Sequence, residues 1–179
     1  WDGNRAINYG GYKYMEGRWE KVAREMVKHY KLPKNPKILD VGCGKGFMLH
    51  DFREALPGIN VSGIDISKYC LQNAMESVKP FLEYASCDSL PYSDNSFDLV
   101  IAIATIHNLD LNGVKQSLKE IMRVTRKDAF IKVNGFVTNE ERDALEEWNL
   151  VARTILHVDV WKKLFEETQY TGDYYWFTP

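Results

Sequence analysis

The sequence predicts an α/β fold, a three-layer sandwich in which helices cover both faces of a mainly parallel central sheet. The first observation is that short apolar runs alternate with helical stretches along the 179-residue chain, a rhythm typical of parallel strands joined by helices. The second is a compact apolar run, Lys37–Val41, that ends in a glycine-rich turn. The third is that the runs Val100–Ala104 and Phe130–Val133 contain few charged residues, as expected of strands covered on both faces.

Each expected strand is a short apolar run bounded by turn residues. In chain order these runs are Lys37–Val41, Asn60–Ile66, Glu83–Cys87, Asp98–Ala104 and Ala129–Val133. The stretches between them have helical patterns, and they predict helices at Gly46–Ala55, Ser67–Val78 and Val114–Val124.

Further elements are expected at both ends of this alternating part. Before the first strand, Arg18–Tyr30 is predicted to form an amphipathic helix. After the fifth strand, either Thr138 or Asn139 is expected to cap a helix that runs through Trp148, and Asp159–Glu167 predicts another helix. The aromatic run Tyr174–Phe177 is expected to be a closing strand that packs one face in the core, with stacking on a substrate as the alternative.

Composition and charge describe a single ordinary domain. Hydrophobic residues make up 45% of the chain, and no window holds the roughly 18 consecutive apolar residues of a membrane span, so no membrane partner is expected. The net charge of −2 argues against a broad nucleic-acid interface, which usually needs a basic domain. Cys43, Cys70 and Cys87 lack metal-binding spacing, so we expect reduced thiols, no metal site and a cytoplasmic location.

The turn after the first strand carries the strongest ligand signal. It reads Asp40-Val41-Gly42-Cys43-Gly44-Lys45-Gly46, and three glycines at alternate positions exceed what a tight turn needs. Glycines let the backbone approach a ligand closely and adopt dihedral angles closed to other residues. Ligands of open parallel sheets bind at the carboxyl ends of the strands, where this turn is expected. A nucleotide-like ligand is therefore predicted, and a turn without a ligand is the alternative.

Two features of this loop disfavour a dinucleotide. The dinucleotide fingerprint is GxGxxG, with the pyrophosphate at the helix N-terminus, whereas the spacing here is GxGxG and Phe47 follows Gly46. Asp40 stands two positions before the first glycine, where a carboxylate repels a pyrophosphate but suits a ligand with a cationic amino-acid group. An NAD-dependent oxidoreductase is thus a disfavoured alternative.

The loop and three later segments resemble the motifs of class I S-adenosylmethionine (SAM)-dependent methyltransferases. Asp40–Gly46 resembles the first motif of that family, D/E-x-G-x-G-x-G, without departure. Val61–Ser67, Ser86–Pro91 and Ser96–Ile101 look like the next motifs, in the expected order. The resemblance covers roughly Pro36–Val133, and four motifs in order are more specific than one. It implies a Rossmann-like fold, SAM as the cofactor and S-adenosylhomocysteine (SAH) as the product.

The resemblance also implies which residues contact SAM. Asp65 would hold both ribose hydroxyls, Ile66 would pack on the adenine, and Asp88 would accept a hydrogen bond from the adenine amino group. Taken alone, Asp65 is also explained as a helix N-cap and Asp88 as a turn residue. The full expected set is Asp40, Gly42, Cys43, Gly44, Gly46, Asp65, Ile66, Asp88, Ser89, Leu90, Ile103, Tyr12 and Tyr14.

His107 is the first candidate for a catalytic base. It follows the fourth strand, beside the expected methyl group, and imidazole titrates near neutral pH. The alternative is a histidine that hydrogen-bonds locally and shapes the acceptor pocket. His157 is a second candidate, for which an exposed position at a helix start is the simpler interpretation. The same stretch lacks the Asn/Asp-Pro-Pro-Tyr/Phe run of enzymes that methylate amino groups of nucleic-acid bases, and no acidic triad for Mg²⁺ is evident.

The segment Asn4–Tyr14 is rich in tyrosine and glycine although it precedes the first strand. In proteins that the chain resembles, such segments often cover the cofactor. Residues 1–30 are therefore expected to form an arm and helix that act as a lid, with Tyr12 and Tyr14 near the sulfonium, and residues 31–179 to form the SAM-binding domain. An arm that packs its aromatic rings on the domain is the alternative.

Three basic residues, Arg5, Lys13 and Arg18, bear on the acceptor. Their charges suit an anionic acceptor such as a phosphate or a carboxylate, and a solvated surface is the alternative. We expect methyl transfer to a small polar acceptor with an oxygen nucleophile. A weaker resemblance to small stand-alone bacterial methyltransferases of surface-polysaccharide synthesis suggests a sugar or nucleotide-linked precursor. A small-molecule N-methyltransferase and a silent SAM-binding partner subunit are the alternatives, and a homodimer is left open.

Overall fold

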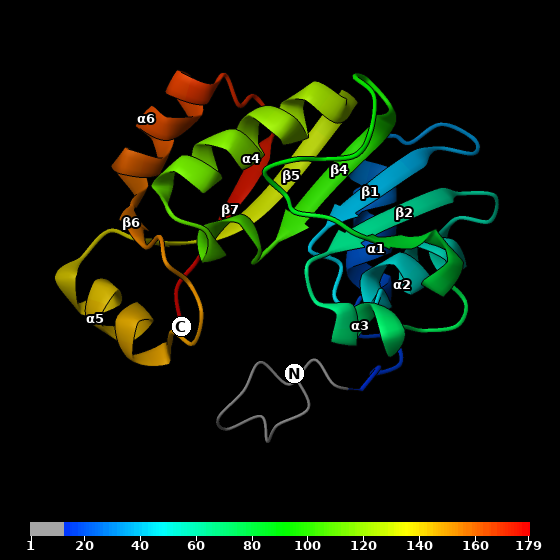
Figure 1. Cartoon of the computed structure of the whole chain (residues 1–179), viewed down its shortest axis with the longest axis horizontal. Helices are drawn as coiled ribbons and strands as arrows, with labels where there is room; N and C mark the ends of the chain where they lie inside the picture. Colours follow the sequence, from blue (N-terminus) through cyan, green and yellow to red (C-terminus); the bar gives the residue numbers. More distant parts are fainter. Residues whose placement is uncertain (1–12) are drawn as a thin grey trace.

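The computed structural model describes residues 13–179, which form an α/β fold on a seven-stranded sheet. The strands are β1 (Lys37–Val41), β2 (Asn60–Asp65), β3 (Leu82–Tyr84), β4 (Phe97–Ile103), β5 (Thr125–Phe136), β6 (Leu156–His157) and β7 (Asp173–Phe177). The order is β3-β2-β1-β4-β5, and β7 and β6 pair with successive parts of β5. All these pairs are parallel (Figure 1), so the predicted Rossmann-like sheet is confirmed.

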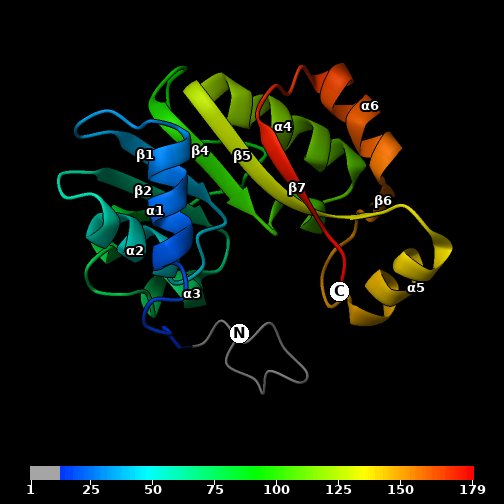
Figure 2. The same ribbon diagram turned by 180° about the vertical axis from the view of Figure 1, so that it is seen from behind.

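Helices cover both faces of the sheet, as predicted. They are α1 (Glu20–His29), α2 (Phe47–Ala55), α3 (Lys68–Gln72), α4 (Leu111–Val124), α5 (Asn139–Trp148) and α6 (Val158–Thr168). Helices α4 and α6 pack on the face seen in Figure 1, and α1 and α2 pack on the opposite face, where Figure 2 shows α1 in front. No helix within residues 13–179 is long and apolar enough to cross a membrane.

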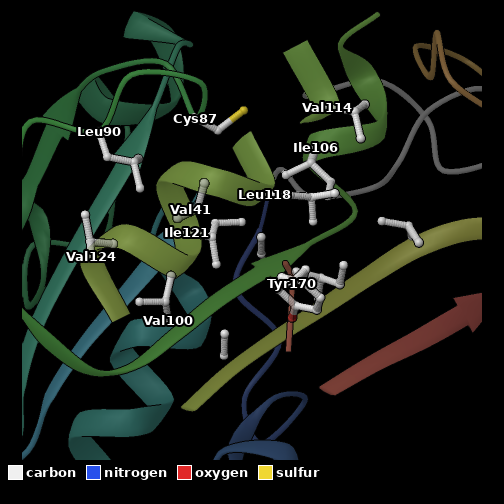
Figure 3. Close-up of a cluster of buried hydrophobic side chains, with 14 of the residues drawn as sticks. Val41, Cys87, Leu90, Val100, Ile106, Val114, Leu118, Ile121, Val124 and Tyr170 are labelled. Carbon is white, nitrogen blue, oxygen red and sulfur yellow. The ribbon is translucent and has the colours of Figure 1, made fainter. Parts of the chain in front are cut away.

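Each face of the sheet has its own hydrophobic core. In the first core, drawn in Figure 3, Leu118 and Ile121 of α4 pack with Val100 of β4. In the second, Ala23 of α1 and Phe52 of α2 pack in one cluster with strand residues of the other face. Each fully buried aliphatic or aromatic side chain stabilises the fold by about 1.5–3 kcal/mol. These cores fix the strands and so fix the loops at their ends.

The ends of β1, β2 and β4 meet at the carboxyl edge of the sheet. Strand β1 lies between β2 and β4, so the chain leaves β1 to one side and returns on the other. Such a reversal opens a crevice beyond the strand ends, which is where α/β proteins bind ligands. The glycine loop after β1 lies at this edge.

Strand β5 is covered differently on its two faces. Ile131 and Val133 are buried in the first core, whereas Phe130 and Lys132, on the other face, are only partly buried. The expectation that this strand is covered on both faces is met in part, since Phe130 packs against the second core and Asn134 is buried, whereas Lys132 stays partly exposed. In Figure 2, β5 and β7 lie beside α1 rather than beneath it.

The structure corrects the predicted helix Ser67–Val78, since α3 ends at Gln72. The amide of Met75 donates to the Lys45 carbonyl at 3.0 Å, and the Val78 side chain packs against Gly46. These long-range contacts hold the segment against the glycine loop and replace the hydrogen bonds of a continuing helix.

Two strand predictions also need correction, and one strand was missed. The third strand is Leu82–Tyr84 rather than Glu83–Cys87, because Ser86 pairs with Ser89 in an isolated bridge. The fifth strand is longer than predicted, since its charged N-terminal part also pairs with β4. Strand β6 was not predicted. The other predicted elements agree with the structure within a few residues, and Thr138 caps α5 as expected.

Candidate functional site

The three glycines of the loop after β1 have backbone conformations that other residues rarely adopt. The angle φ is +79° at Gly42, +57° at Gly44 and +77° at Gly46. A side chain at Gly42 would overlap the side chain of Thr105, and a Cβ at Gly46 would lie 2.6 Å from Val78 Cγ2. The glycines therefore permit both the turn and the close approach of neighbouring segments.

Hydrogen bonds hold this loop against the end of β2. The amides of Gly42 and Cys43 both donate to the Ile64 carbonyl, at 2.8 and 2.9 Å. The Gly44 amide donates to Asp65 Oδ2 at 2.8 Å, and the Ser67 amide donates to Asp65 Oδ1 at 2.7 Å. Both carboxylate oxygens of Asp65 thus accept from the backbone, which fixes the carboxylate beside the glycine loop.

Asp65 is not the N-cap of the following helix. The cap of α3 is Ser67, whose hydroxyl oxygen accepts from the Cys70 amide at 3.2 Å. Between these two residues, Ile66 exposes 63% of its surface. The end of β2 therefore presents a fixed carboxylate and an uncovered apolar side chain side by side, which suits a ribose and a flat ring.

Asp40 is a buried carboxylate near the end of β1. Its residue surface is 5% exposed, and the carboxylate has no hydrogen-bond partner within residues 13–179. Burial, and then the charge of Asp65, raise the pKa of Asp40 to about 7. A buried carboxylate without a partner is costly when ionised. A cationic group of a ligand would relieve that cost.

The loop after β3 contains the predicted residues Asp88, Ser89 and Leu90. Ser89 forms the bridge to Ser86, and Leu90 is buried in the first core. The Leu90 amide also donates to Glu120 Oε2 at 2.8 Å, so the loop is tied to α4.

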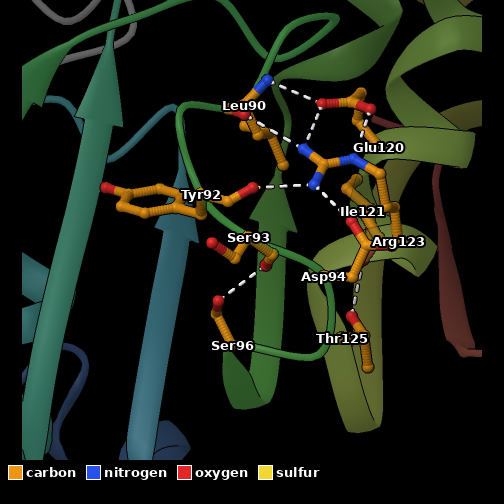
Figure 4. A network of polar contacts seen from close by, with 9 residues as sticks. All are labelled: Leu90, Tyr92, Ser93, Asp94, Ser96, Glu120, Ile121, Arg123 and Thr125. Carbon is orange, nitrogen blue, oxygen red and sulfur yellow. Dashed lines mark hydrogen bonds and ion pairs between the residues drawn. The ribbon is translucent and has the colours of Figure 1, made fainter.

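Arg123 strengthens this connection (Figure 4). Its guanidinium donates to the carbonyls of Leu90 and Tyr92, at 3.0 and 2.7 Å. It also pairs with Glu120 at 2.7 Å and with Asp94 at 2.9 Å. Hydrogen bonds to charged groups contribute about 1.5–3 kcal/mol each, so this fork is a strong clamp on the loop.

The chain that follows β4 has an unusual backbone conformation. Ala104 has φ +55°, and its amide donates to the Lys132 carbonyl at 2.9 Å. Asn108 Nδ2 donates to the Ala104 carbonyl at 3.4 Å, whereas Asn108 Oδ1 is buried without a partner in the described range. A non-glycine residue in the left-handed region costs on the order of 1 kcal/mol, and such strain concentrates at functional sites.

His107 is held by hydrogen bonds in the interior. It is 3% exposed, and its Nδ1 accepts from the Asn134 amide at 3.2 Å, so the proton of the neutral ring is on Nε2. Burial, and then the charge of Lys132, lower the pKa of His107 to about 4. Neither ring nitrogen is then free to accept a proton. Its role as a base stays a prediction, and this geometry favours the alternative of local hydrogen bonding.

Tyr14 lies against the first turns of α2. Its hydroxyl donates to Asp51, and its ring meets His50 edge-on at 5.1 Å between centroids. The hydrogen bond to Asp51 raises the pKa of Tyr14 to about 12. The predicted Tyr12 and Arg5 lie outside the described residues, so the lid stays a prediction for the segment before α1.

The remaining predicted residues fall at different places. His157 caps α6, where its Nδ1 accepts from the Asp159 amide at 3.1 Å, so the interpretation as a helix-start residue agrees with the structure. Ile103 ends β4 and pairs in register with Lys132. Sequence reasoning missed Lys132 and Asn134, although Lys132 is the lone charge in the apolar run 129–133.

The described residues offer no metal centre at this site, and the cavity of about 560 Å³ lies elsewhere. No group of three or more His, Cys, Asp or Glu residues in the range 13–179 is arranged to hold a metal ion. The cavity lies between α2 and the start of β2, with His50, Arg53 and Phe81 in its lining. Asn60 also lines it, at the end of β2 opposite Asp65, so this cavity lies away from the site.

Comparisons with known proteins identify the family of this chain. Residues 39–133 match a family model described as a methyltransferase domain. The chain is 29% identical over 143 residues to the ubiquinone/menaquinone biosynthesis C-methyltransferase UbiE of Geotalea uraniireducens, covering 75% of this chain and 57% of that protein. It is 27% identical over 162 residues to an O-methyltransferase of Pyrenophora dematioidea, covering 83% and 59%. The chain thus spans less than two thirds of the length of these curated relatives.

Solved structures show the same fold. The crystal structure of the YcgJ protein from Bacillus subtilis has a TM-score of 0.68 and 18% sequence identity. The match covers 83% of this chain and 68% of that one. At this identity the likeness concerns the fold, while the reaction has to be argued from the site.

Proposed function

Since the chain belongs to the methyltransferase-domain family, we propose that it transfers a methyl group from SAM to a small polar acceptor at the carboxyl edge of β1, β2 and β4. The observation that carries this proposal is the loop Asp40–Gly46, whose three glycines have positive φ and whose Gly44 amide bonds to Asp65. By their names, the two relatives transfer methyl groups to carbon and to oxygen, so the family alone leaves the acceptor atom open.

The residues of the site fit SAM. The buried carboxylate of Asp40, which has no hydrogen-bond partner among residues 13–179, suits the ammonium of the amino-acid part. Asp65 and the exposed Ile66 suit the ribose and the adenine, and Asp88, on the clamped loop, suits the adenine amino group. When bound, SAM would supply a methyl carbon on a cationic sulfur, which would leave as the neutral thioether of SAH once the methyl group is transferred to the acceptor.

The protein contributes chiefly by holding the reactants in line. The glycine loop is fixed to β2, and the strained turn at Ala104 is fixed to β5, so the groups at the edge are set before the ligands bind. Such positioning supplies much of the rate gain in displacements of this kind. Because His107 has no free basic nitrogen here, an acceptor oxygen that ionises near neutral pH is favoured.

In this proposal His107 is a positioning residue. Its ring accepts from the Asn134 amide, and its carbonyl accepts from the amides of Arg153 and Thr154, both at 3.0 Å. It therefore joins the end of β4 to β5 and to the segment before β6. An asparagine at this position could accept from the Asn134 amide in its place, whereas an alanine could not.

The test is the release of SAH from SAM with a panel of small carboxylates, phosphate esters, phenols and amines. We expect release with at least one oxygen acceptor, most turnover retained in His107→Asn, and losses of both turnover and stability in His107→Ala. A general base contributes about 10²–10⁴-fold, so a base role predicts that both variants lose turnover on that scale with SAM affinity intact. Tight SAM binding without SAH release would favour the silent partner subunit.

A further inference from the structure

Lys132 is a cation in a place where lysine is uncommon. It lies on β5, on the face that α1 and α2 leave partly uncovered, and its side chain is only partly exposed. Its ammonium lies 4.2 Å from the centroid of the Phe177 ring of β7. Burial, and then the nearby charge of Arg18, lower the pKa of Lys132.

Neither of these two cations has an anionic partner in the part of the chain that the structure describes. Among residues 13–179, no carboxylate forms an ion pair with Lys132 or with Arg18. The Arg18 guanidinium instead meets the Met15 sulfur and the Trp19 ring. A partly buried lysine without a carboxylate partner, with its pKa lowered further by the charge of Arg18, is an unfavourable arrangement, because burial penalises an unpaired charge.

Asn134 provides a second, independent sign of a missing ligand. It lies two residues after Lys132 on β5, hence on the same face of the strand. The residue is 2% exposed, and its Nδ2 is buried without a hydrogen-bond acceptor in the described range. An unsatisfied buried donor costs about 1–3 kcal/mol, so its two N–H groups suit an oxygen acceptor from a ligand.

These groups lie beside the expected position of methyl transfer. Lys132 pairs in register with Ile103 at the end of β4, and Ile101 of β4 pairs with Asp40 of β1. Neighbouring strands lie about 4.8 Å apart, and β4 alone separates β1 from β5. A small molecule bound at this edge can therefore extend from Asp40 to Lys132.

We propose that Lys132, with Asn134 and Arg18, forms the binding site for an anionic oxygen group, a carboxylate or a phosphate ester, of the methyl acceptor. The inference rests on the proposed function, because it assigns the acceptor half of the same site. The anion would pair with the Lys132 ammonium and the Arg18 guanidinium. It would also accept a hydrogen bond from Nδ2 of the Asn134 side chain. The Phe177 ring would bound the site and keep the lysine stem in place. The cation–π contact with Phe177 is worth about 0.5–2 kcal/mol, but the ring supplies no hydrogen-bond acceptor. The Lys132 ammonium can therefore still donate to an anion.

The test is calorimetric titration of the SAH-loaded protein with benzoate, phenyl phosphate and the neutral isostere benzamide. We expect benzoate or phenyl phosphate to bind at least tenfold more tightly than benzamide. The stronger of the two anions identifies the carboxylate or the phosphate as the source. Lys132→Met should abolish the preference, and Lys132→Arg should retain most of it.

Lys119→Met, on the exposed face of α4, is the matched control and should keep the full preference. SAH affinity is measured in each variant as a check on folding. Equal binding of benzoate, phenyl phosphate and benzamide, or a preference that survives Lys132→Met, would overturn the anion site while SAH binding still supports the proposed function. Loss of SAH binding by the wild type would instead contradict the proposed function itself.

Discussion

Asp40 is a buried carboxylate whose surroundings disfavour its ionised form. Its carboxylate has no described partner, and the nearby charge of Asp65 opposes its ionisation. Burial and this charge raise its pKa to about 7, so the folded protein keeps a proton there to a higher pH than the unfolded chain does. Perturbed groups of this kind cluster at functional sites, where a ligand supplies the missing charge.

We expect Asp40→Asn to change the pH dependence of stability. When folding raises the pKa of an acid, the native state is destabilised as the pH rises from the unfolded pKa, about 4, to the native one. Relative to Asp40→Asn, the wild type should therefore lose on the order of 2–4 kcal/mol of unfolding free energy over this range. Urea unfolding at a series of pH values measures this difference.

The matched control is Glu147→Gln on the exposed surface of α5, which should leave the pH profile of stability unchanged. Asp40→Asn should also bind SAM more weakly, because a neutral amide cannot pair with the ammonium. Stability profiles that run parallel for the wild type and Asp40→Asn would contradict the raised pKa.

Gly42 allows a second prediction. The cost of its left-handed backbone conformation can be separated from the cost of overlap between an added side chain and Thr105. Gly17 has φ +73°, and a Cβ added there would lie 3.8 Å from its nearest neighbouring atom, whereas at Gly42 the side chain of Thr105 occupies the space. Gly17→Ala should therefore cost only the backbone penalty, about 1–2 kcal/mol. Gly42→Ala should cost roughly 1–3 kcal/mol more, because the overlap must be relieved.

Thermal and urea unfolding of the two variants give the comparison. Gly42→Ala should also lose SAM affinity, since the loop would move, whereas Gly17→Ala serves as the control for stability alone. Equal destabilisation by the two substitutions would show that the close approach of Thr105 does not constrain the loop.

At the scale of elements, α4 positions a loop that would contact the adenine. Arg123 and Glu120 of α4 hold the backbone of residues 90–92, just after Asp88. The clamp acts on main-chain atoms, so it sets the course of the loop without contributing to the ligand surface. Asp88 therefore depends on a helix whose other face is in the hydrophobic core.

We expect Arg123→Met to lower SAH affinity about tenfold, equivalent to about 1.4 kcal/mol, because Asp88 loses its fixed position. Hydrogen exchange at residues 88–92 should become faster at the same time. Arg142→Met, which removes an arginine that pairs only on the surface of α5, is the control and should change neither quantity. Unchanged SAH affinity in Arg123→Met would mean that the loop does not need the clamp.

In two elements, long-range contacts override the structure that the local sequence pattern predicts. The run after Ser67 is helical in pattern, yet α3 stops at Gln72 because Met75 bonds to the glycine loop and Val78 packs on Gly46. The start of β5 was missed for a related reason. Its charged residues do not fit the pattern of a buried strand, but Arg126 pairs with Asp98 at the start of β4.

For the whole molecule, the mainly parallel sheet could be predicted, because the alternation of strands and helices is a local pattern. The expected SAM contacts were assigned from motifs of residues close together in sequence, and they stay a prediction. The glycine loop and Asp65 are such cases, and the Gly44–Asp65 hydrogen bond joins them in space. The acceptor half could not be predicted in the same way. Lys132 reaches the edge beside Ile103 through sheet register, and the charge of Arg18, which lies far away in sequence, acts on it through the fold.

His107 illustrates the same limit. Its place after β4 was evident, but its hydrogen bond to the Asn134 amide depends on how β5 lies beside β4. That bond decides which ring nitrogen holds the proton, and so decides what the residue can do. Residue type and position alone therefore identified a candidate base where the fold holds a neutral, buried ring.

The central claim is that the Asp40–Gly46 loop binds SAM, and calorimetric titration of the protein with SAM and with NAD tests it most directly. The account predicts saturable binding of one SAM per chain, weakened in Asp40→Asn, and no binding of NAD. Saturable binding of NAD without binding of SAM would contradict it.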